Sequence, residues 1–351
     1  MESIYLKVYD RDLIFLGVID RYSSLRWRRK YFETGEFELH IDPTKNNMKL
    51  LQYDNIIVRS DIQAEEFGII NSWQIDDDGE KVSIAIHGEF GLSLLKRRLL
   101  RNRITFNGTF INAFKTVLQA ITPFNRLDIV ASSIVSGNID FQVTYKNVYK
   151  FHERLARASN IAGKITLDIP NRRYKYSNYI GLDRTNDQTT NIRHVFSEDH
   201  NNIDKAVYTY TRNNLVNWVL VGGQGEGTAR ILRTITANTG STHDFDKREI
   251  FVDAKAESND GLTVSEYNAV LDAIGREKLD DPLTTFEVVA NPLHYRTTWN
   301  LGDIVTIIKE SWGMQEKQRI TEVEEIIENG HLTIIPTFGS PISEALGEEE
   351  D

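Results

Sequence analysis

Two stretches near opposite ends of the chain repeat one pattern, and this repeat constrains the fold more than any other feature. FELHIDP occupies residues 37–43, and FEVVANP occupies residues 286–292. Each alternates apolar and polar residues at its start and then stops at Asp-Pro or Asn-Pro. Such a pattern favours a strand that ends in a turn.

The similarity continues downstream of both stretches in the same order. Each copy has two further strand-like runs, a tight Asx-Gly turn and a last strand-like run. The first copy consists of DNIIVRS (54–60), FGIINSWQI (67–75), Asp78-Gly79 and KVSIAIHG (81–88). The second consists of GDIVTII (302–308), QRITEVEEII (318–327), Asn329-Gly330 and HLTIIPTFG (331–339).

The matched order predicts two copies of a small antiparallel barrel or sandwich. In each copy the apolar positions of the first strand should face the interior. These positions are Phe37, Leu39 and Ile41 in the first copy and Phe286 and Val288 in the second. The alternative is chance, since short alternating runs recur in many β-proteins.

The region between the copies has a different character. Apolar residues at helical spacing predict helices in GTFINAFKTVLQAIT (108–122) and NVYKFHERLARASNIAG (147–163), and two strand-like runs follow. Residues 98–189 are therefore expected to form a small α+β domain. A capping box at Thr263 and Glu266 predicts a further helix, whose apolar face (Val270, Leu271, Ile274, Leu279) should pack on that middle domain.

The resulting fold class is mainly β with an α+β middle domain, and the second β copy is split by an insertion. The expected boundaries are 1–97 for the first β domain, 98–189 for the middle domain, 190–237 and 286–340 for the two parts of the second β domain, 238–285 for the helical insertion and 341–351 for an acidic tail.

The stretch VLVGGQGEGTAR (219–230) raises the question of a nucleotide site. Its glycines lack the spacing of a dinucleotide fingerprint, and no Gly-Lys-Ser/Thr follows. The next residues, ARILRTIT, alternate like a strand and supply no helix N-terminus for a phosphate. We therefore expect a hairpin or bulge in the second β domain, with at least one glycine at positive φ.

Composition narrows the function classes. The chain has no cysteine and a net charge of −10, which excludes thiolate chemistry and disfavours tight binding of nucleic acid. No apolar run approaches the ~20 residues that span a bilayer, and the polar N-terminus is not a secretory signal. We expect no catalytic, cofactor-binding or metal-binding residues and no cofactor.

Individual polar motifs point to no chemistry. The eight histidines show no metal-ligand spacing; His40 and His87 are expected to face solvent from strands, and a metal site at His194, Asp199 and His200 is disfavoured. DDDGE (76–80) lacks the full calcium-loop pattern. The basic run LLKRRLLRNR (94–103) is interpreted as a solvated helix face, with an acidic partner surface as the alternative.

The order of these motifs resembles the phage tail baseplate hub and tail-tip proteins of PBSX-type prophages and siphoviruses, relatives of the T-even baseplate hub and of the N-terminal part of tail-associated lysins. The residues that carry the resemblance are TGEFELHIDP (34–43), EEFGIINSW (65–73), HGEFGLSLLKRR (87–98), VGGQGEGTAR (221–230), WNLGDIVTI (299–307) and TIIPTFG (333–339).

The resemblance implies two tube-like β-barrels and a homotrimer whose six quasi-equivalent barrels join a sixfold tail tube to a threefold spike or tip. It implies a channel for DNA or tape-measure protein. The implied partners are a tail tube or distal tail protein, a spike or tip protein and the tape-measure protein. The implied location is a virion or phage-like particle, prophage or tailocin included, assembled in the bacterial cytoplasm.

Two other functions remain open at this stage. A tail-associated lysin that degrades cell wall needs an acidic pair in a cleft, which 51 Asp and Glu residues can supply. A carbohydrate-binding adhesion module can use the five tryptophans (27, 73, 218, 299, 312), although their apolar strand patterns favour core or interface positions. Because the sequence given stops at Asp351, soon after the second copy, lytic activity is expected on another polypeptide.

Overall fold

The computed structural model describes residues 4–339 except 63–65, 78, 80–81, 122–123, 201, 238–242, 258, 260, 280–282, 292–293 and 329. It divides into two compact bodies. The main body comprises residues up to 207 and 287–338, and the side body comprises 208–286. The strands hold 46% of the residues and the helices 19%, so the chain is mainly β, as predicted.

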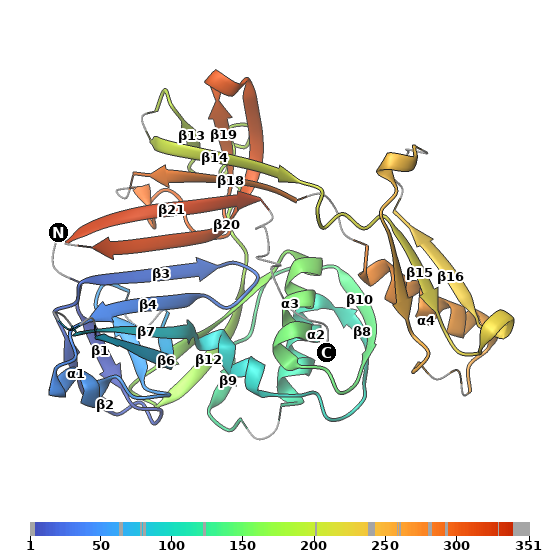
Figure 1. Cartoon of the computed structure of the whole chain (residues 1–351), viewed down its shortest axis with the longest axis horizontal. Coiled ribbons are helices and arrows are strands. Elements are labelled where there is room, and N and C mark those ends of the chain that lie inside the picture. Colours follow the sequence, from blue (N-terminus) through green and yellow to red (C-terminus); the bar gives the residue numbers. More distant parts are fainter. Residues whose placement is uncertain are drawn as a thin grey trace. The chain divides into compact units, whose positions relative to one another are not determined.

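The first β copy forms an N-terminal module, shown in blue in Figure 1. Its elements are β1 (Leu6–Tyr9), β2 (Phe15–Ile19), β3 (Ser24–Lys30), β4 (Glu36–Ile41), α1 (Lys45–Leu50), β5 (Ile56–Arg59), β6 (Gly68–Asp77) and β7 (Val82–Phe90). The second copy forms a C-terminal module. Its elements are β13 (Val195–Ser197), β14 (Ile203–Thr211), β18 (Leu283–Ala290), β19 (Ile304–Lys309), η5 (Glu310–Trp312), β20 (Met314–Glu328) and β21 (His331–Gly339).

The two modules have the same strand order. The N-terminal module runs β3-β4-β7-β6-β5, and the C-terminal module runs β14-β18-β21-β20-β19. The repeated strands of the sequence therefore occupy equivalent places. Both modules belong to one thirteen-stranded sheet, in which β20 of the second module pairs with β3 of the first (Figure 1). The sequence did not predict this continuous sheet.

A β-bulge recurs at the same position in both modules. In the first, Asn71 is skipped between Ile70 and Ser72 where β6 pairs with β7. In the second, Thr321 is skipped between Ile320 and Glu322 where β20 pairs with β21. A bulge adds one residue to one strand and increases its twist. A shared bulge at one register is hard to obtain by chance, and it fixes the residue equivalence of the two strands.

The expected core positions are buried. Phe37, Leu39 and Ile41 are at most 3% exposed, and Phe286 and Val288 at most 2%. The Phe37 ring sits against two glycines of the neighbouring strands, Gly68 and Gly88, where a Cβ would come within 2.3 Å of it. The Asx-Gly turns are described only at their glycines: Gly79 and Gly330 have positive φ, and Asp78 and Asn329 lie outside the described residues.

The middle domain has the two helices predicted in 108–122 and 147–163 and the two strands predicted after them. It also has strands before and between these helices that the sequence did not predict. Its elements are η1 (Gly91–Arg97), β8 (Ile104–Thr109), α2 (Phe110–Gln119), β9 (Leu127–Ile129), β10 (Asn138–Val143), α3 (Val148–Ser159), β11 (Ala162–Asp168) and β12 (Arg173–Tyr179). Side chains of α2 and α3 share one apolar core with β11 and β12. Inside it, His152 is fully buried and bonds the Tyr176 hydroxyl at 2.8 Å.

The side body is a small sheet covered by a helix. Its elements are β15 (Trp218–Gly222), η2 (Gly227–Ala229), β16 (Leu232–Thr236), η3 (Asp244–Asp246), β17 (Glu249–Asp253) and α4 (Val264–Glu277). The strand order is β16-β15-β17, and the predicted capping box of α4 is present.

Two expectations about this region were wrong. The strands at 218–222 and 232–236 were assigned to the second barrel, but they form a sheet of their own with β17. The apolar face of α4 was expected to pack on the middle domain. Leu271 and Ile274 instead share a core with Val219, Val221 and Ile235 of that sheet. A helix and sheet next to each other in sequence can bury their apolar faces together.

The glycine loop is a hairpin connection, as predicted. It links the antiparallel strands β15 and β16, and Gly225 and Gly227 have positive φ. Its backbone closes on itself, because the Gly223 amide donates to Ile231 O at 2.8 Å.

The helices of the described residues are too short or too polar to span a membrane.

Candidate functional site

The joint between the two modules brings polar side chains of both together along β20 and β3. Seven consecutive residue pairs join β20 to β3, from Glu322–Lys30 to Glu328–Ser24. The strands are antiparallel, so each pair brings two side chains to the same face of the sheet. The joint therefore has a core face, with Trp27 and Glu325, and a solvent face, with Arg28 and Glu324.

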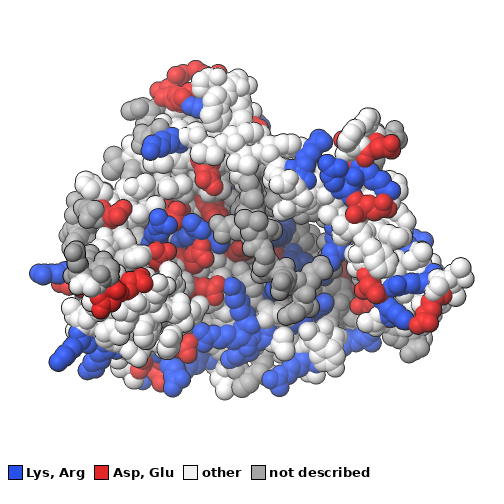
Figure 2. All heavy atoms as spheres, in the orientation of Figure 1, with Lys and Arg blue, Asp and Glu red and all other residues white. Residues whose placement is uncertain are grey.

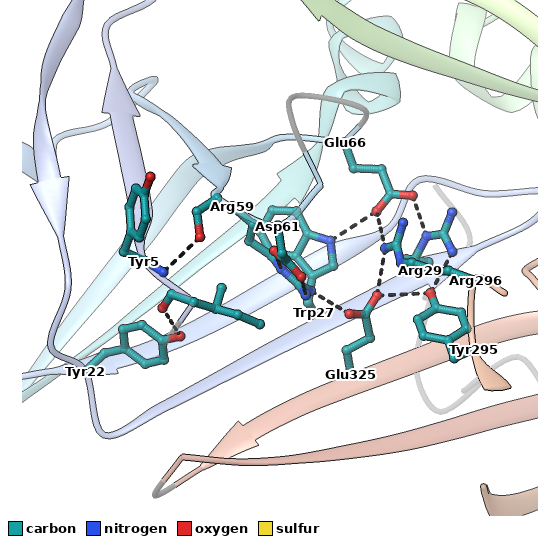
Figure 3. Close-up of polar contacts among 12 residues, drawn as sticks. Tyr5, Tyr22, Trp27, Arg29, Arg59, Asp61, Glu66, Tyr295, Arg296 and Glu325 are labelled. Carbon is teal, nitrogen blue, oxygen red and sulfur yellow. Dashed lines mark hydrogen bonds and ion pairs between the residues drawn. The ribbon is translucent and has the colours of Figure 1, made fainter. Parts of the chain in front are cut away.

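The core face of the joint holds a buried ion network (Figure 3). The Glu325 carboxylate contacts Arg59 Nη1 at 2.7 Å and Arg296 Nη2 at 2.9 Å. Glu66 pairs with Arg29 and lies 3.5 Å from Arg296. The side chains of Arg59 and Glu325 are only 1% and 2% exposed. Segments distant in sequence thus meet in one network.

Two neutral side chains and a third carboxylate complete this network. The Tyr295 hydroxyl donates to Glu325 at 3.0 Å and accepts from Arg29 at 2.6 Å. The Trp27 indole N–H donates to Glu66 at 3.3 Å. Asp61 accepts from Arg59 at 2.6 Å. Buried charges are tolerated when they are paired and hydrogen-bonded, and here both conditions are met.

The pKa shifts show how strongly these groups interact. Burial alone raises the pKa of a carboxyl group. For Glu325, however, Arg59, Arg296 and Arg29 outweigh burial and hold the pKa at about 2. Burial works against the charged form of Arg59, yet Glu325 and Asp61 raise the pKa of this guanidinium. The network stays ionised at neutral pH and holds the two modules in one register of β20 on β3.

Two strands of the modules, β6 and β14, each have an edge that no described strand covers along part or all of its length. Only the first two residues of β6, Gly68 and Ile69, pair with β5. From Ser72 to Asp77, β6 pairs with β7 alone among the described strands. At the far end of the sheet β14 pairs with β18, and no described strand covers its other side. Unpaired edges attract further strands.

The solvent face of the joint carries charges of both signs. Figure 2 shows basic and acidic side chains intermixed over β20, β3 and β4, with no single basic patch there. A shallow groove on this face is lined by Arg26, Arg28, Glu36, Glu38, His87, Glu89 and Glu324 among others. On the same face of the joint Glu322 lies opposite Lys30, and burial raises the pKa of this carboxyl to about 7.

One cavity of about 260 Å³ lies in the main body among the two modules and the middle domain. Its charged lining groups include Arg29 and Glu66, which pair with each other, and Arg184 and Asp303, which pair at 2.5 Å. These four groups pair with one another at the junction of the two modules and the middle domain.

The tryptophans and histidines that the sequence singled out differ in burial. Trp27 and Trp299 are buried, whereas Trp312 is 48% exposed.

His40 and His87 lie on the solvent face near Glu38. His194 is buried against Phe196 and Trp299, and burial lowers its pKa to about 4. His200 bonds Ser197. In the basic run, Lys96 pairs with Glu89 and Arg97 with Asp54.

Sequence reasoning missed the ion network. Arg29, Arg59, Glu66 and Glu325 come from four separate segments, and nothing in their spacing links them. One available signal was the charge at an expected core position: Glu325 stands in a strand where the alternation requires an inward residue. A charge at such a position indicates a buried partner.

The fold is that of phage tail proteins. The tail protein from Neisseria meningitidis MC58 is similar over 96% of this chain and 97% of its own, with 13% identity and a TM-score of 0.57. The 43 kDa tail protein of prophage MuSo2 from Shewanella oneidensis has the same identity and TM-score over 96% and 98%. Prophage tail protein gp18 from Listeria monocytogenes EGD-e reaches 0.53 at 13% identity, over 97% and 95%.

The sequence itself places the chain in a family. The family model described as Siphovirus ReqiPepy6 Gp37-like protein matches residues 5–340. The chain belongs to this family of siphovirus tail proteins. Comparison with curated proteins gives no match. The chain is thus a protein of the phage tail type.

Proposed function

We propose that this chain is the hub of a phage or phage-like tail, a homotrimer in which six β modules form a ring. The ring would connect a sixfold tail tube to a threefold spike or tip. Three chains with two equivalent modules each satisfy both symmetries at once. In this proposal the chain has a purely structural role, without a catalytic or cofactor-binding site.

The single observation that carries the proposal is the equivalence of the modules. Both have the order of β3-β4-β7-β6-β5, and both have a bulge at the same register. Within one chain the second module is already joined to the first, strand to strand. A ring of six requires this same joint between chains, three more times.

The charge of the sheet surface supports a channel. One face of the N-terminal sheet is buried under β1, β2 and α1, whose Leu6, Ile19 and Leu50 share its core. The other face must then be the one that a ring turns toward its axis. There Arg26, Arg28 and Lys30 are interleaved with five acidic side chains: Glu36, Glu38, Glu89, Glu322 and Glu324.

A lining with this excess of acid suits a conduit. DNA is bound mainly through contacts of basic side chains with its phosphates. A face on which arginines are already paired with glutamates, such as Arg28 with Glu36 and Glu324, offers few such contacts. DNA or tape-measure protein would pass along it without being held.

The proposed partners follow from the place of a hub. A tail tube or distal tail protein would contact one end of the ring, and a spike or tip protein the other. The tape-measure protein would enter the channel. Assembly would take place in the bacterial cytoplasm, before the particle is released.

Copy number in the assembled tail tests this function. Particles are purified, the chain is located by electron microscopy, and its copies are counted against the tube protein. The expected result is three copies per tail, with both modules of each chain in one ring around the axis. A different copy number, or modules at different radii, contradicts the proposal.

A further inference from the structure

The closed β3–β20 joint serves as a template for the two open edges of the chain. Because the modules are equivalent strand by strand, the open part of β6 corresponds to the part of β20 that pairs with β3. In the same way, β14 corresponds to β3. A strand edge that is paired in one module thus has an unpaired counterpart in the other.

We infer that residues 72–77 of β6 in one chain pair antiparallel with β14 (Ile203–Thr211) of a second copy, in the register of β20 on β3. The inference rests on the proposed trimeric ring and specifies the contact between its chains. The partner of this edge is therefore a second copy of this chain.

The shared bulge sets the register on the β6 side. Ile70 and Ile320 precede the bulge, and Ser72 and Glu322 follow it. Counting on from the bulge, Trp73 takes the place of Val323, and Ile75 takes the place of Glu325. These two side chains therefore belong to the core face of the new joint.

Contacts between aromatic side chains set the register on the β14 side. Trp27 of β3 lies opposite Phe37 in the first module, with ring centroids 5.7 Å apart. In the second module Tyr208 contacts Phe286, the equivalent of Phe37, with centroids 6.3 Å apart. Tyr208 therefore takes the place of Trp27.

The two assignments match apolar side chains across the new joint. In the closed joint Glu325 faces Trp27, and Val323 faces Arg29. The equivalent pairs are Ile75 with Tyr208 and Trp73 with Tyr210. Cross-strand pairs of aromatic and β-branched side chains stabilise sheets.

Exposure in the single chain supports this pairing. Trp27 and Glu325 are covered in the closed joint, at 0% and 2% exposed. Their counterparts Tyr208 and Ile75 are 37% and 42% exposed, and Tyr210 is 51% exposed. Apolar and aromatic side chains with this much exposed surface beside an open strand edge are typical of a contact surface.

Charge at the ends of the strands agrees with the antiparallel direction. Asp76 and Asp77 end β6, whereas Lys205 lies near the start of β14. In the proposed register Asp76 lies opposite Val207 and diagonal to Lys205, on the same face of the sheet. Opposite charges within reach across a sheet are favourable.

Disulfide crosslinking tests the register directly. The natural chain has no cysteine, so two introduced thiols report on one contact. Side chains directly opposite on antiparallel strands are close enough for a disulfide. We expect tails assembled with the double variant Ile75→Cys/Tyr208→Cys to yield, on oxidation, covalent trimers on a non-reducing denaturing gel.

A matched control moves one thiol to the other face of the same strand. Ile75→Cys/Val207→Cys uses a residue that is 58% exposed but points away from the core face, and it should give at most a trace of trimer. If tails contain three copies but the 75/208 pair does not crosslink, or the 75/207 pair crosslinks equally, the inference is wrong and the trimeric hub stands. A copy number other than three overturns the hub itself.

Hydrogen exchange of the unmodified protein provides a second measurement if the variants do not assemble. Amides at residues 72–77 and 203–211 should exchange at least about tenfold more slowly in tails than in the isolated chain. The edge strand β2 (Phe15–Ile19), at the other end of the sheet, should change little. Protection at β2 with none at β6 and β14 overturns the inference.

Discussion

The two β modules share their central strands and differ at their margins. In the N-terminal module the strand beside β5 is β1, which pairs antiparallel with it. In the C-terminal module the strand beside β19 is β13, which pairs in parallel. The repeat is therefore a property of the five central strands. The marginal strands close each module in its own way.

The cores of the modules are filled from different strands. In the first module Phe37 of β4 rests on Gly68 and Gly88. In the second, the position equivalent to Gly88 is Phe338, which contacts Phe196 of β13 at 5.0 Å between ring centroids. One strand order thus accepts two packing solutions, because strand pairing depends on the backbone and packing depends on total volume. Changes to the two cores should therefore have different effects.

The largest expected effect comes from the aromatic residue that begins each repeat. Phe37→Ala and Phe286→Ala should each lower the free energy of unfolding by about 3–5 kcal/mol. Phe37→Ala should lie at the upper end, since two glycines leave a cavity that no side chain can fill. Urea denaturation followed by tryptophan fluorescence measures both. Phe245→Ala, at a residue 79% exposed, is the control, and equal losses for all three variants would contradict the comparison.

The next effect concerns the closed joint between β3 and β20. Glu325→Ala leaves Arg59 and Arg296 buried without their carboxylate and should cost about 3–5 kcal/mol of stability. Glu328→Ala, at an exposed position of the same strand, should change stability by less than about 0.5 kcal/mol. Thermal unfolding of both variants measures the difference. A loss below 1 kcal/mol for Glu325→Ala, on the order of a surface change, would show that the network does not lock the joint.

Acid should open the same joint. The pKa of Glu325 is lowered in the folded chain to about 2, so its carboxylate stabilises the fold above pH ~4.5, and this contribution is lost as pH falls toward 2. The loss should reach about 3 kcal/mol at most. Because His152, with a pKa lowered to about 3, also destabilises the fold in acid, the measurement compares wild type with Glu325→Gln. Their stability difference should shrink between pH 5 and 2 (roughly), and a constant difference would contradict this assignment.

The smallest effect lies on the solvent face of the joint. Burial raises the pKa of Glu322 to about 7, so the folded chain favours the protonated form. Wild-type stability should fall as pH rises from ~4.5 through 7. Glu322→Gln removes this penalty and should raise stability at pH 8 by on the order of 1 kcal/mol. Destabilisation at pH 8 would mean that pairing with Lys30 and Arg28 outweighs burial.

The sequence predicted the elements better than their connections. Alternation and Asx-Gly turns located β4 to β7 in the first module and β18 to β21 in the second, and helical spacing located α2 and α3. They did not locate β1, β2, β3 or β13. These are local signals, fixed by residues close in the chain. The joint of β20 with β3 escaped prediction because strand pairing over some three hundred residues leaves no local pattern.

The side body shows a second limit of sequence patterns. The strand pattern of β15 and β16 was recognised, and so was the capping box of α4. Their partners were misassigned, because the apolar face of a helix shows that it is buried but not against what. Of the candidate site, the sequence predicted the repeated strands. It did not predict the ion network, because the residues of the network form no pattern along the chain.

One strand has a mechanical consequence. β20 pairs with β19 through its first half and with β3 through its second, and it does so without a break in the backbone. A pull along this strand on either module would load its hydrogen bonds to β19 and β3 in shear. In the trimeric hub proposed above, a force along the tail would pass from one module to the other through three such continuous strands.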